Sequence, residues 1–517
     1  MSRYVKLLSA LLVSAALAST LFATTAVAQE STEPSGELVV SLSSDPTSLF
    51  MPRTADRTAS NTAWSLYDSL VWIDEDFEIV PALATSWEIS EDGTEYTFQL
   101  REGVTFHNGE PFTAESVVAT WETGMDPSND YANVFEEAES VEIIDDHTVR
   151  ITTPEPNATF LTRLATFWGM VPPEYIAEVG IDEFAQNPVG TGPFRFVSRT
   201  AGDRVVMEAN PDYWDEGLPK VERLVYRVIP DASTRLAAIQ TGEIDIANRL
   251  TFDQVSVLEG NDNVEVVTYL NDRAYYVGFK NIGNGEGSPI EDRNVRLALN
   301  YGLDRYGIIQ AIFSGQAEPL PGFVVQGNLA YDEEMMQPFP YDPERAQELL
   351  AQAGYPDGFQ IALSCPADGY VNINEVCLAI QRSLADIGVE INVDFRTTNS
   401  FWSEPRYGVT GPMYVDSWSS EIGEALPRLQ GALVPGNYYN TWEDERIAEL
   451  IQEIEQEVDR KARAQLYQEM HRLMTEDPPF IYLYQPMIFE ATRANVEGYD
   501  PRPAEEYFLK TVSLEEE

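Results

Sequence analysis

The stretch of residues 187–246 constrains the fold of this chain more than any other, because turns, strands and one helix alternate along it. Two prolines and two glycines within residues 187–194 predict a sharp chain reversal ahead of a strand at residues 194–197. Residues 223–230 alternate apolar and polar side chains, as is typical of a half-buried strand. Asp231 then caps a helix that ends at Gly242, and residues 243–246 return to a strand. This order of elements indicates a mixed α/β protein.

Four short phrases in this stretch follow one another in a characteristic order. They are Val-Gly-Thr-Gly-Pro-Phe (residues 189–194), Asn-Pro-Asp-Tyr-Trp (210–214), Ile-Pro-Asp-Ala (229–232) and Gln-Thr-Gly-Glu-Ile-Asp (240–245). Together they resemble the peptide/nickel class of ABC-transporter solute-binding proteins, the extracellular solute-binding proteins of family 5. Matching phrases continue through residues 67–114, 275–281, 292–305 and 489–499, so that the resemblance covers nearly all of the chain after its N-terminal segment.

The resemblance implies an α/β fold of two lobes joined by crossing strands, the periplasmic binding protein or "Venus flytrap" fold, with an additional domain inserted in the first lobe. We expect a signal peptide at residues 1–28, the first lobe at 29–66, 187–275 and 486–517, the inserted domain at 67–186, and the second lobe at 276–485. A ligand would be buried between the two lobes.

The N-terminal segment has the pattern of a secretory signal. Arg3 and Lys6 precede the apolar residues 7–22, and Ala-Val-Ala at residues 26–28 is a typical cleavage site. This predicts cleavage before Gln29 and a periplasmic protein that is not inserted in the membrane. The cleavage point has no cysteine that would carry a lipid. The alternative is a membrane anchor, but the apolar run is shorter than the ~20 residues that a membrane span requires.

The composition narrows the class of ligand and partner. The formal net charge is −52, and it becomes −54 without residues 1–28, which hold two basic and no acidic side chains. Such a charge argues against binding nucleic acid or anionic membranes. It is compatible with an acidic, well-solvated surface and also with a cationic ligand. Three histidines and two cysteines argue against a metal cage, so no cofactor is expected.

The two cysteines, Cys365 and Cys377, are predicted to form a disulfide because they would reside in an oxidising compartment. Such a bridge stabilises a protein by about 3 kcal/mol in the chain-entropy model. The alternative is a pair of buried thiols. Around them, a strand at residues 359–364, a helix at 377–387 and a strand at 389–395 suggest a crossover on a parallel sheet. Residues 443–475 predict a long acidic helical region with a drifting apolar face that includes Val458.

The resemblance also indicates where a peptide ligand would be held. Peptide-binding members have a Trp-x-x-Asp phrase whose carboxylate binds the α-ammonium of the peptide. The matching residues here are Trp418 to Glu421, followed by Glu424. Glu421 is therefore either an ammonium anchor or one more surface acid.

Members that bind dipeptides carry an arginine for the peptide carboxylate in the segment that matches residues 366–370, and this chain has none there. This favours oligopeptides over dipeptides and predicts that C-terminal amidation of the ligand is harmless. Aromatic residues in loops of the same lobe either contact the ligand or belong to the core; they are Tyr370, Trp402, Trp418, Tyr438 and Tyr439.

The sequence thus predicts a monomeric, non-catalytic receptor. It would deliver a peptide-like or other small-molecule solute to an ABC permease and its ATPase. The same fold could instead take an oligosaccharide, an opine, haem or a metal chelate. A secreted hydrolase is the alternative from another class, but neither Gly-x-Ser-x-Gly nor His-Glu-x-x-His occurs in the chain. His107, between Phe106 and an Asn-Gly turn, is expected to be structural.

Overall fold

The computed structural model describes residues 33–515 except residues 55, 76, 368, 369 and 421. The predicted signal peptide and the side chain of Glu421 therefore lie outside the described residues. Within the described ranges, no helix has both the length and the apolar character that crossing a membrane requires.

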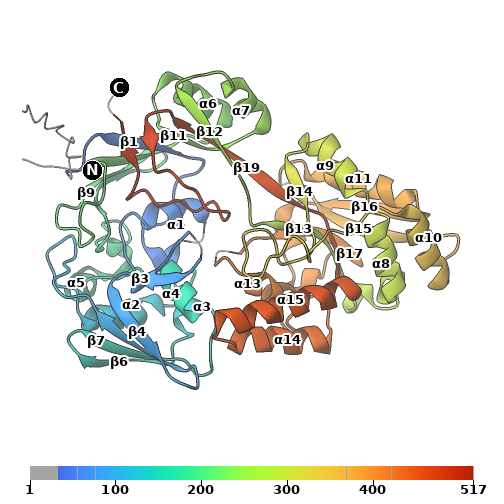
Figure 1. The fold of residues 1–517 in the computed structure, drawn as a ribbon, viewed down its shortest axis with the longest axis horizontal. Helices are drawn as coiled ribbons and strands as arrows, with labels where there is room; N and C mark the ends of the chain where they lie inside the picture. The colour runs from blue at the N-terminus through green and yellow to red at the C-terminus, as the bar shows by residue number, and fades with distance from the viewer. Residues whose placement is uncertain (1–32, 55, 76, 368–369, 421, 516–517) are drawn as a thin grey trace, which may run out of the picture.

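The first lobe is built on an eight-stranded sheet in the order β12-β19-β11-β1-β10-β9-β8, with β14 paired to β19 (Figure 1). Its strands are β1 (Glu37–Leu42), β8 (Phe194–Thr200), β9 (Arg204–Ala209), β10 (Arg223–Val228), β11 (Ile246–Leu250), β12 (Val264–Leu270) and β19 (Tyr484–Arg493), whereas β14 (Ala317–Pro319) pairs with the end of β19 that lies in the second lobe. β1 runs parallel to β10 and to β11, whereas β8, β9, β12 and β19 pair antiparallel with their neighbours. Helices α6 (Ala232–Thr241) and α7 (Phe252–Leu258) pack on this sheet.

The predictions for residues 187–246 are confirmed at β8, β10 and α6, whereas the strand predicted at residues 243–246 begins only at Ile246, as β11. The carboxylate of Asp231 accepts a hydrogen bond from the backbone N–H of Thr234 at 2.8 Å, and Gly242 ends α6 with φ of 73°. Strand β9 was not predicted, because three consecutive buried residues, Val205 to Met207, give it no alternating pattern.

The glycines of the turn before β8 are required by close packing. A Cβ atom on Gly190 would lie 2.1 Å from the carbonyl oxygen of Leu66, and one on Gly192 would lie 2.4 Å from the carbonyl carbon of Leu66. His107 holds the same turn, since its Nδ1 accepts a hydrogen bond from the N–H of Gly190 at 3.2 Å. Burial lowers the pKa of His107 to about 4, so the ring is neutral at pH 7. The predicted structural role of His107 is confirmed.

A separate antiparallel sheet lies between β1 and β8 in the sequence, in the order β4-β5-β7-β6. Its elements are β4 (Ala84–Ile89), β5 (Glu95–Leu100), β6 (Ser140–Asp145), β7 (Thr148–Thr152), α2 (Ala114–Gly124), α3 (Ala132–Phe135), α4 (Phe160–Phe167) and α5 (Pro173–Phe184), with the small hairpin β2 (Val71–Ile73) and β3 (Ile79–Pro81) beside them. Phe98, Phe135 and Trp168 are fully buried in its core. We call this part the inserted domain; its boundaries in the sequence remain a prediction.

The second lobe contains a five-stranded sheet in the order β16-β15-β17-β13-β18. Its strands are β13 (Ala274–Phe279), β15 (Phe359–Pro366), β16 (Val389–Arg396), β17 (Met413–Trp418) and β18 (Phe480–Tyr482), with helices α8 (Arg293–Tyr301), α9 (Arg305–Phe313), α10 (Pro343–Gln352), α11 (Ile373–Ala385), α12 (Thr398–Phe401) and α13 (Leu426–Leu433). β15 and β16 are parallel and α11 connects them, as the sequence predicts. Cys365 and Cys377 are joined by a disulfide, with their Cα atoms 6.6 Å apart.

The acidic helical region forms two packed helices, α14 (Glu445–Gln456) and α15 (Arg460–Glu476), with a break that the sequence analysis did not predict. Asp459 is the N-cap of α15, because its carboxylate accepts a hydrogen bond from the N–H of Ala462 at 2.7 Å. Val458 lies in the break and is 40% exposed, although the apolar pattern had placed it on the buried face.

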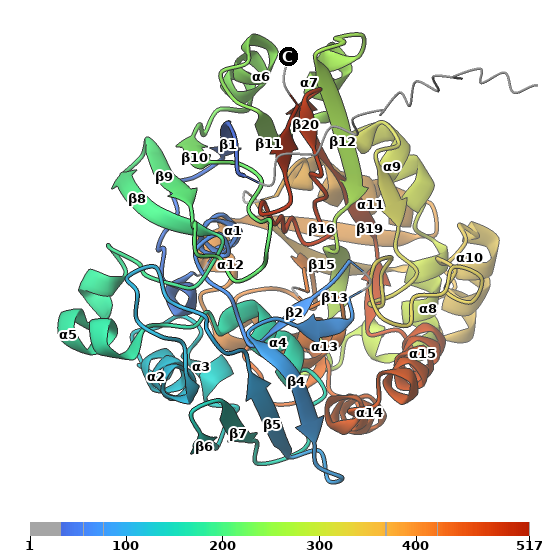
Figure 2. The same cartoon turned by 60° about the vertical axis from the view of Figure 1, so that its left-hand side comes forward.

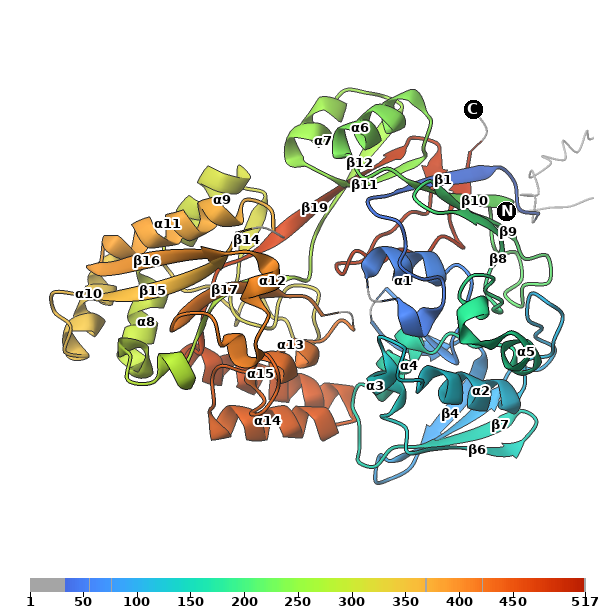
Figure 3. The ribbon, with the colours of Figure 1, turned by 180° about the vertical axis from the view of Figure 1, so that it is seen from behind.

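Two segments connect the lobes. Residues 271–273 link β12 to β13, and β19 pairs with β14 at one end and with β12 and β11 at the other. Figure 3 shows β19 running from one lobe to the other. The chain after β19, with β20 (Val496–Glu497) and β21 (Ser513–Leu514), returns to the first lobe beside β11 and β12 (Figure 2).

Candidate functional site

The two sheets direct the carboxyl ends of their parallel strands toward the region between the lobes. In the second lobe, β15, β16 and β17 are parallel and so end at one edge, where the antiparallel β13 begins after the linker. In the first lobe, β11 runs antiparallel to β19, and β1 runs parallel to β11. Because β19 arrives from the second lobe, β1 and β11 end toward that lobe. Ligands of open α/β sheets bind outside such carboxyl ends, which makes this inter-lobe region the candidate site.

Asp416 organises the second-lobe side of the site from near the end of β17. Its carboxylate accepts hydrogen bonds from the hydroxyl of Tyr370 at 2.8 Å, from Nε1 of Trp402 at 3.1 Å, from the backbone of Ser417 at 2.8 Å and from the hydroxyl of Tyr407. The residue is only 4% exposed, and burial raises the pKa of its carboxyl group while these donors oppose the rise. Both oxygens of Asp416 are therefore engaged within the lobe.

The predicted aromatic residues gather around this carboxylate. Tyr370 and Trp402 both donate to Asp416, and the hydroxyl of Tyr438 donates to the carbonyl of Trp402 at 2.9 Å. The ring of Trp418 meets the ring of Tyr439 edge-on, with centroids 5.4 Å apart. Tyr438 and Tyr439 remain 44% and 36% exposed. The structure thus brings these five aromatic residues into one region of the second lobe.

Glu424 makes contacts that are separate from those of Asp416. Nε and Nη2 of Arg463 donate to its two carboxylate oxygens at 3.0 and 2.7 Å, and the hydroxyl of Tyr467 donates at 2.8 Å. Glu424 is 5% exposed. Since both oxygens have buried partners, the geometry favours a structural role over ligand contact.

The linker is anchored to the second lobe by Asp272, which is 3% exposed. Oδ2 of Asp272 accepts from the backbone N–H of Ser420 at 2.9 Å and pairs with Nη2 of the fully buried Arg428 at 3.3 Å. Burial raises the pKa of Asp272 to about 6, against the opposing charge of Arg428. The loop that contains the predicted anchor phrase is therefore attached directly to the linker.

On the first-lobe side, Arg249 in β11 is held by Glu505. Nε of Arg249 donates to Oε2 of Glu505 at 2.6 Å, and Nδ2 of Asn271 in the linker donates to Oε1 at 3.1 Å. Nearby, Glu490 of β19 is 1% exposed and accepts hydrogen bonds from the hydroxyls of Tyr269 at 3.1 Å and Tyr499 at 2.5 Å. Burial, with the negative charge of Glu505, raises the pKa of Glu490 to about 7.

The inserted domain touches the second lobe at the other side of this region. The backbone N–H of Ala158 donates to the carbonyl of Glu455 at 2.8 Å, and Arg460 pairs with Glu78. A Cβ atom on Gly423 would lie 2.3 Å from the ring of Phe77, so Phe77 packs directly on the loop that precedes α13. Lobe contact in this structure thus involves the inserted domain.

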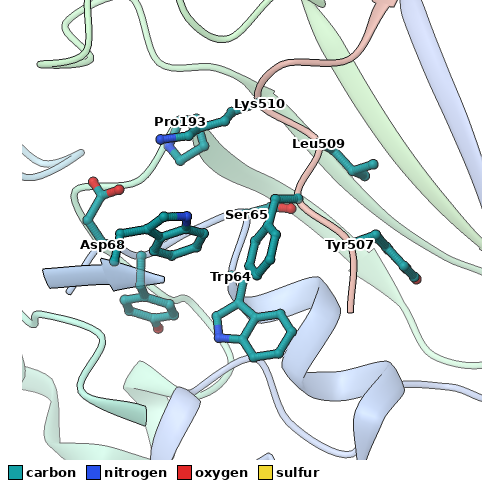
Figure 4. A pocket seen from close by; sticks show the side chains of 10 residues that line it. Trp64, Ser65, Asp68, Pro193, Tyr507, Leu509 and Lys510 are labelled. Atoms are coloured by element: carbon teal, nitrogen blue, oxygen red, sulfur yellow. The ribbon is translucent and has the colours of Figure 1, made fainter. Parts of the chain in front are cut away.

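A pocket within the first lobe does not fit a solute. It holds a cavity of about 20 Å³ between Asp68, Trp64 and Lys510 (Figure 4), which is room for about one water molecule. Asp68 accepts hydrogen bonds from Tyr213 and Trp214, each at 2.9 Å, and so ties the inserted domain to the phrase at residues 210–214. The role of this pocket is structural.

The sequence analysis missed Asp416, Tyr407 and the linker residues Asp272 and Arg273. The only local signal for Asp416 is a charged side chain near the end of an apolar strand. Arg273 has no such signal, since it precedes β13 and reaches residues that follow it by more than 140 positions.

Comparison with known proteins agrees with this architecture. The sequence model of the bacterial extracellular solute-binding proteins, family 5, middle region, matches residues 78–440. The chain belongs to this family, whose members are substrate-binding transport proteins. The predicted family and the predicted two-lobe α/β fold are confirmed.

Individual relatives are similar over almost their full length. The glutathione-binding protein GsiB of Pectobacterium atrosepticum is 31% identical over 493 residues, which cover 93% of this chain and 94% of the relative. The structure of HbpA2 from Haemophilus parasuis has 27% identity and a TM-score of 0.84, covering 93% of this chain and 100% of that chain. DppA from Helicobacter pylori in complex with the peptide STSA has 27% identity and a TM-score of 0.75, covering 94% and 99%.

Proposed function

We propose that this protein captures a small peptide with a free α-ammonium group between its two lobes and delivers it to an ABC permease and its ATPase. It acts in the periplasm as a monomer, after cleavage of the signal peptide, and catalyses no reaction. The observation that carries the proposal is the inter-lobe edge, where the ends of β15, β16 and β17 present polar and aromatic side chains toward the carboxyl ends of β1 and β11.

The similar proteins support a peptide as the ligand. The names of two of them state that they bind glutathione or the peptide STSA, and both compounds are short peptides. Among the described residues, no group of three or more His, Cys, Asp or Glu side chains is placed to hold a metal ion.

The fold also suggests how the ligand acts on the protein. We expect the lobes to stand further apart in the free protein than around a bound peptide. A ligand then shifts the equilibrium between the open and the closed state, and the size of the shift is set by how much more tightly it binds the closed state.

Glu421 is the proposed anchor of the ligand ammonium group. The neighbouring Ser420 is fixed to the linker through Asp272, so a ligand bound at this loop would act directly on the hinge. A carboxylate that binds an ammonium group makes a charge-assisted hydrogen bond, which strengthens when lobe closure excludes water.

A thermal-shift and calorimetry screen tests the proposal. We expect glutathione and free peptides of two to five residues to stabilise the protein, by about 2.7 kcal/mol at 100 times Kd. N-acetylation of the peptide and the substitution Glu421→Gln should each weaken binding. Glu88→Gln, on the exposed face of the inserted domain, is the matched control.

Three results would contradict the proposal. They are stabilisation by oligosaccharides while no peptide has an effect, unchanged peptide affinity in Glu421→Gln, and release of cleaved peptide during incubation. The first refutes the ligand class, the second refutes the anchor, and the third refutes the non-catalytic role.

A further inference from the structure

Arg273 occupies the point where the linker enters the second lobe. It lies directly before β13, whose first residue pairs with Trp418 at the end of β17. Its Nη1 donates to Oγ of Ser417 at 3.0 Å and its Nη2 donates to Oγ of Ser419 at 3.1 Å. Its backbone N–H donates to Oδ1 of Asn271 at 2.8 Å. The half-buried guanidinium group is therefore held in place at the inter-lobe edge.

The charge of Arg273 has no counter-ion among the described residues. Its two hydrogen-bond acceptors are neutral hydroxyl groups, and these bonds use two of the five N–H donors of a guanidinium group. The buried arginines nearby differ. Arg463 has a bidentate carboxylate partner and two backbone carbonyls, and Arg305 is surrounded by carbonyl oxygens of the second lobe.

The acids around Arg273 are already engaged by other donors. Asp272 is paired with Arg428, and Asp416 accepts from tyrosine and tryptophan side chains. Burial lowers the pKa of Arg428, and the positive charge of Arg273 lowers it further against the opposing charge of Asp272. Among the described residues, Asp272 is thus committed to Arg428, and the positive charge of Arg273 is left without a carboxylate partner. Closing the lobes over the half-buried Arg273 would withdraw its charge from water, which is costly without a partner, and an anionic ligand would compensate it.

We propose that Arg273 binds the C-terminal carboxylate of the peptide ligand. The planar fork of a guanidinium group matches a carboxylate, and its orientation here is set in advance by Ser417 and Ser419. This inference rests on the proposed function and names the second charged group of the ligand. It replaces two expectations from the sequence, namely that C-terminal amidation is harmless and that dipeptides bind poorly for want of a cationic partner. A short peptide with both ends free is the ligand that this arrangement fits.

The test compares free-acid and amidated peptides on matched variants by isothermal titration calorimetry. The probes are glutathione and the tetrapeptide Ser-Thr-Ser-Ala, each as the free acid and as the C-terminal amide. For the wild type, amidation should weaken binding by about tenfold or more, as expected for the loss of a charge-assisted pair. In Arg273→Gln the free acid should bind as weakly as the amide. The affinity of Arg273→Lys for the free acid should lie between those of the wild type and Arg273→Gln, because lysine keeps the positive charge but lacks the planar guanidinium group. Arg345→Gln, which removes an exposed arginine of α10, is the control.

The ratio of acid to amide affinity separates ligand contact from a structural effect. A variant that merely distorts the linker would weaken both forms equally and keep the ratio. The inference is wrong if Arg273→Gln retains the wild-type ratio, or if the wild type does not discriminate between acid and amide; the proposed function would survive either result. If neither peptide binds the wild type in any form, the proposed function fails and this inference fails with it.

Discussion

Replacement of Glu424 by alanine should unfold the second lobe more easily without removing a ligand contact. The substitution leaves Arg463 without its carboxylate partner, although the arginine side chain is only 6% exposed. It also leaves the buried hydroxyl of Tyr467 without its acceptor. Breaking a buried ion pair by removing one partner costs about 3–5 kcal/mol. This is a large part of the 5–15 kcal/mol that is usual for a folded domain.

Urea denaturation measures this change, and peptide titration of the folded variant at low temperature measures affinity separately. We expect the midpoint to fall while the Kd changes by less than about threefold, since no ligand contact is lost. The double variant Glu424→Leu/Arg463→Met should regain most of the stability, because replacing a buried pair by apolar side chains is often neutral. A variant of wild-type stability with strongly weakened peptide binding would refute this reasoning and place Glu424 in the site.

Three further predictions concern a buried acid, the disulfide and the N-terminus. The pKa of Glu490 is raised from 4.5 to about 7, chiefly by burial, so the folded state binds its proton more tightly than the unfolded state. The wild type should therefore gain about 2.5 kcal/mol over Glu490→Gln as the pH falls from 8 to 5, and denaturation midpoints that run in parallel over this range would contradict it. Mass spectrometry without reduction should find the peptides of Cys365 and Cys377 linked; two alkylatable thiols in the native oxidised protein would speak against the bridge. N-terminal sequencing of the exported protein should begin at Gln29, and a product that keeps residues 1–28 in the membrane fraction would overturn the cleavage site.

Local signals explain what could be predicted of the fold. The cap at Asp231 and the left-handed Gly242 bound α6 through residues that are adjacent in the sequence. The parallel pair β15 and β16 followed from a strand, a helix and a strand that are consecutive. Strand β9 escaped prediction because it is buried on both faces, and the break before α15 escaped because the apolar pattern continued through Val458.

The candidate site depends on pairing between distant strands, which a single sequence does not show. β13 and β17 pair antiparallel with Tyr276 opposite Asp416, and only this register brings Arg273 to Ser417. Glu424 shows the same dependence on distant residues. Its closeness to the Trp418 phrase in the sequence predicts a ligand contact, whereas Arg463, 39 positions later, engages its carboxylate in the structure. No local phrase indicates such a partner.

Small-angle X-ray scattering with and without a bound peptide tests the central claim most directly. The account predicts that saturating free Ser-Thr-Ser-Ala or glutathione lowers the radius of gyration, because the lobes close around the ligand. At a concentration near the Kd of the free peptide, the N-acetylated and amidated forms should lower the radius of gyration less than the free peptide does, because they bind more weakly. Tight peptide binding with an identical scattering curve would contradict the claim that the ligand is enclosed between the lobes.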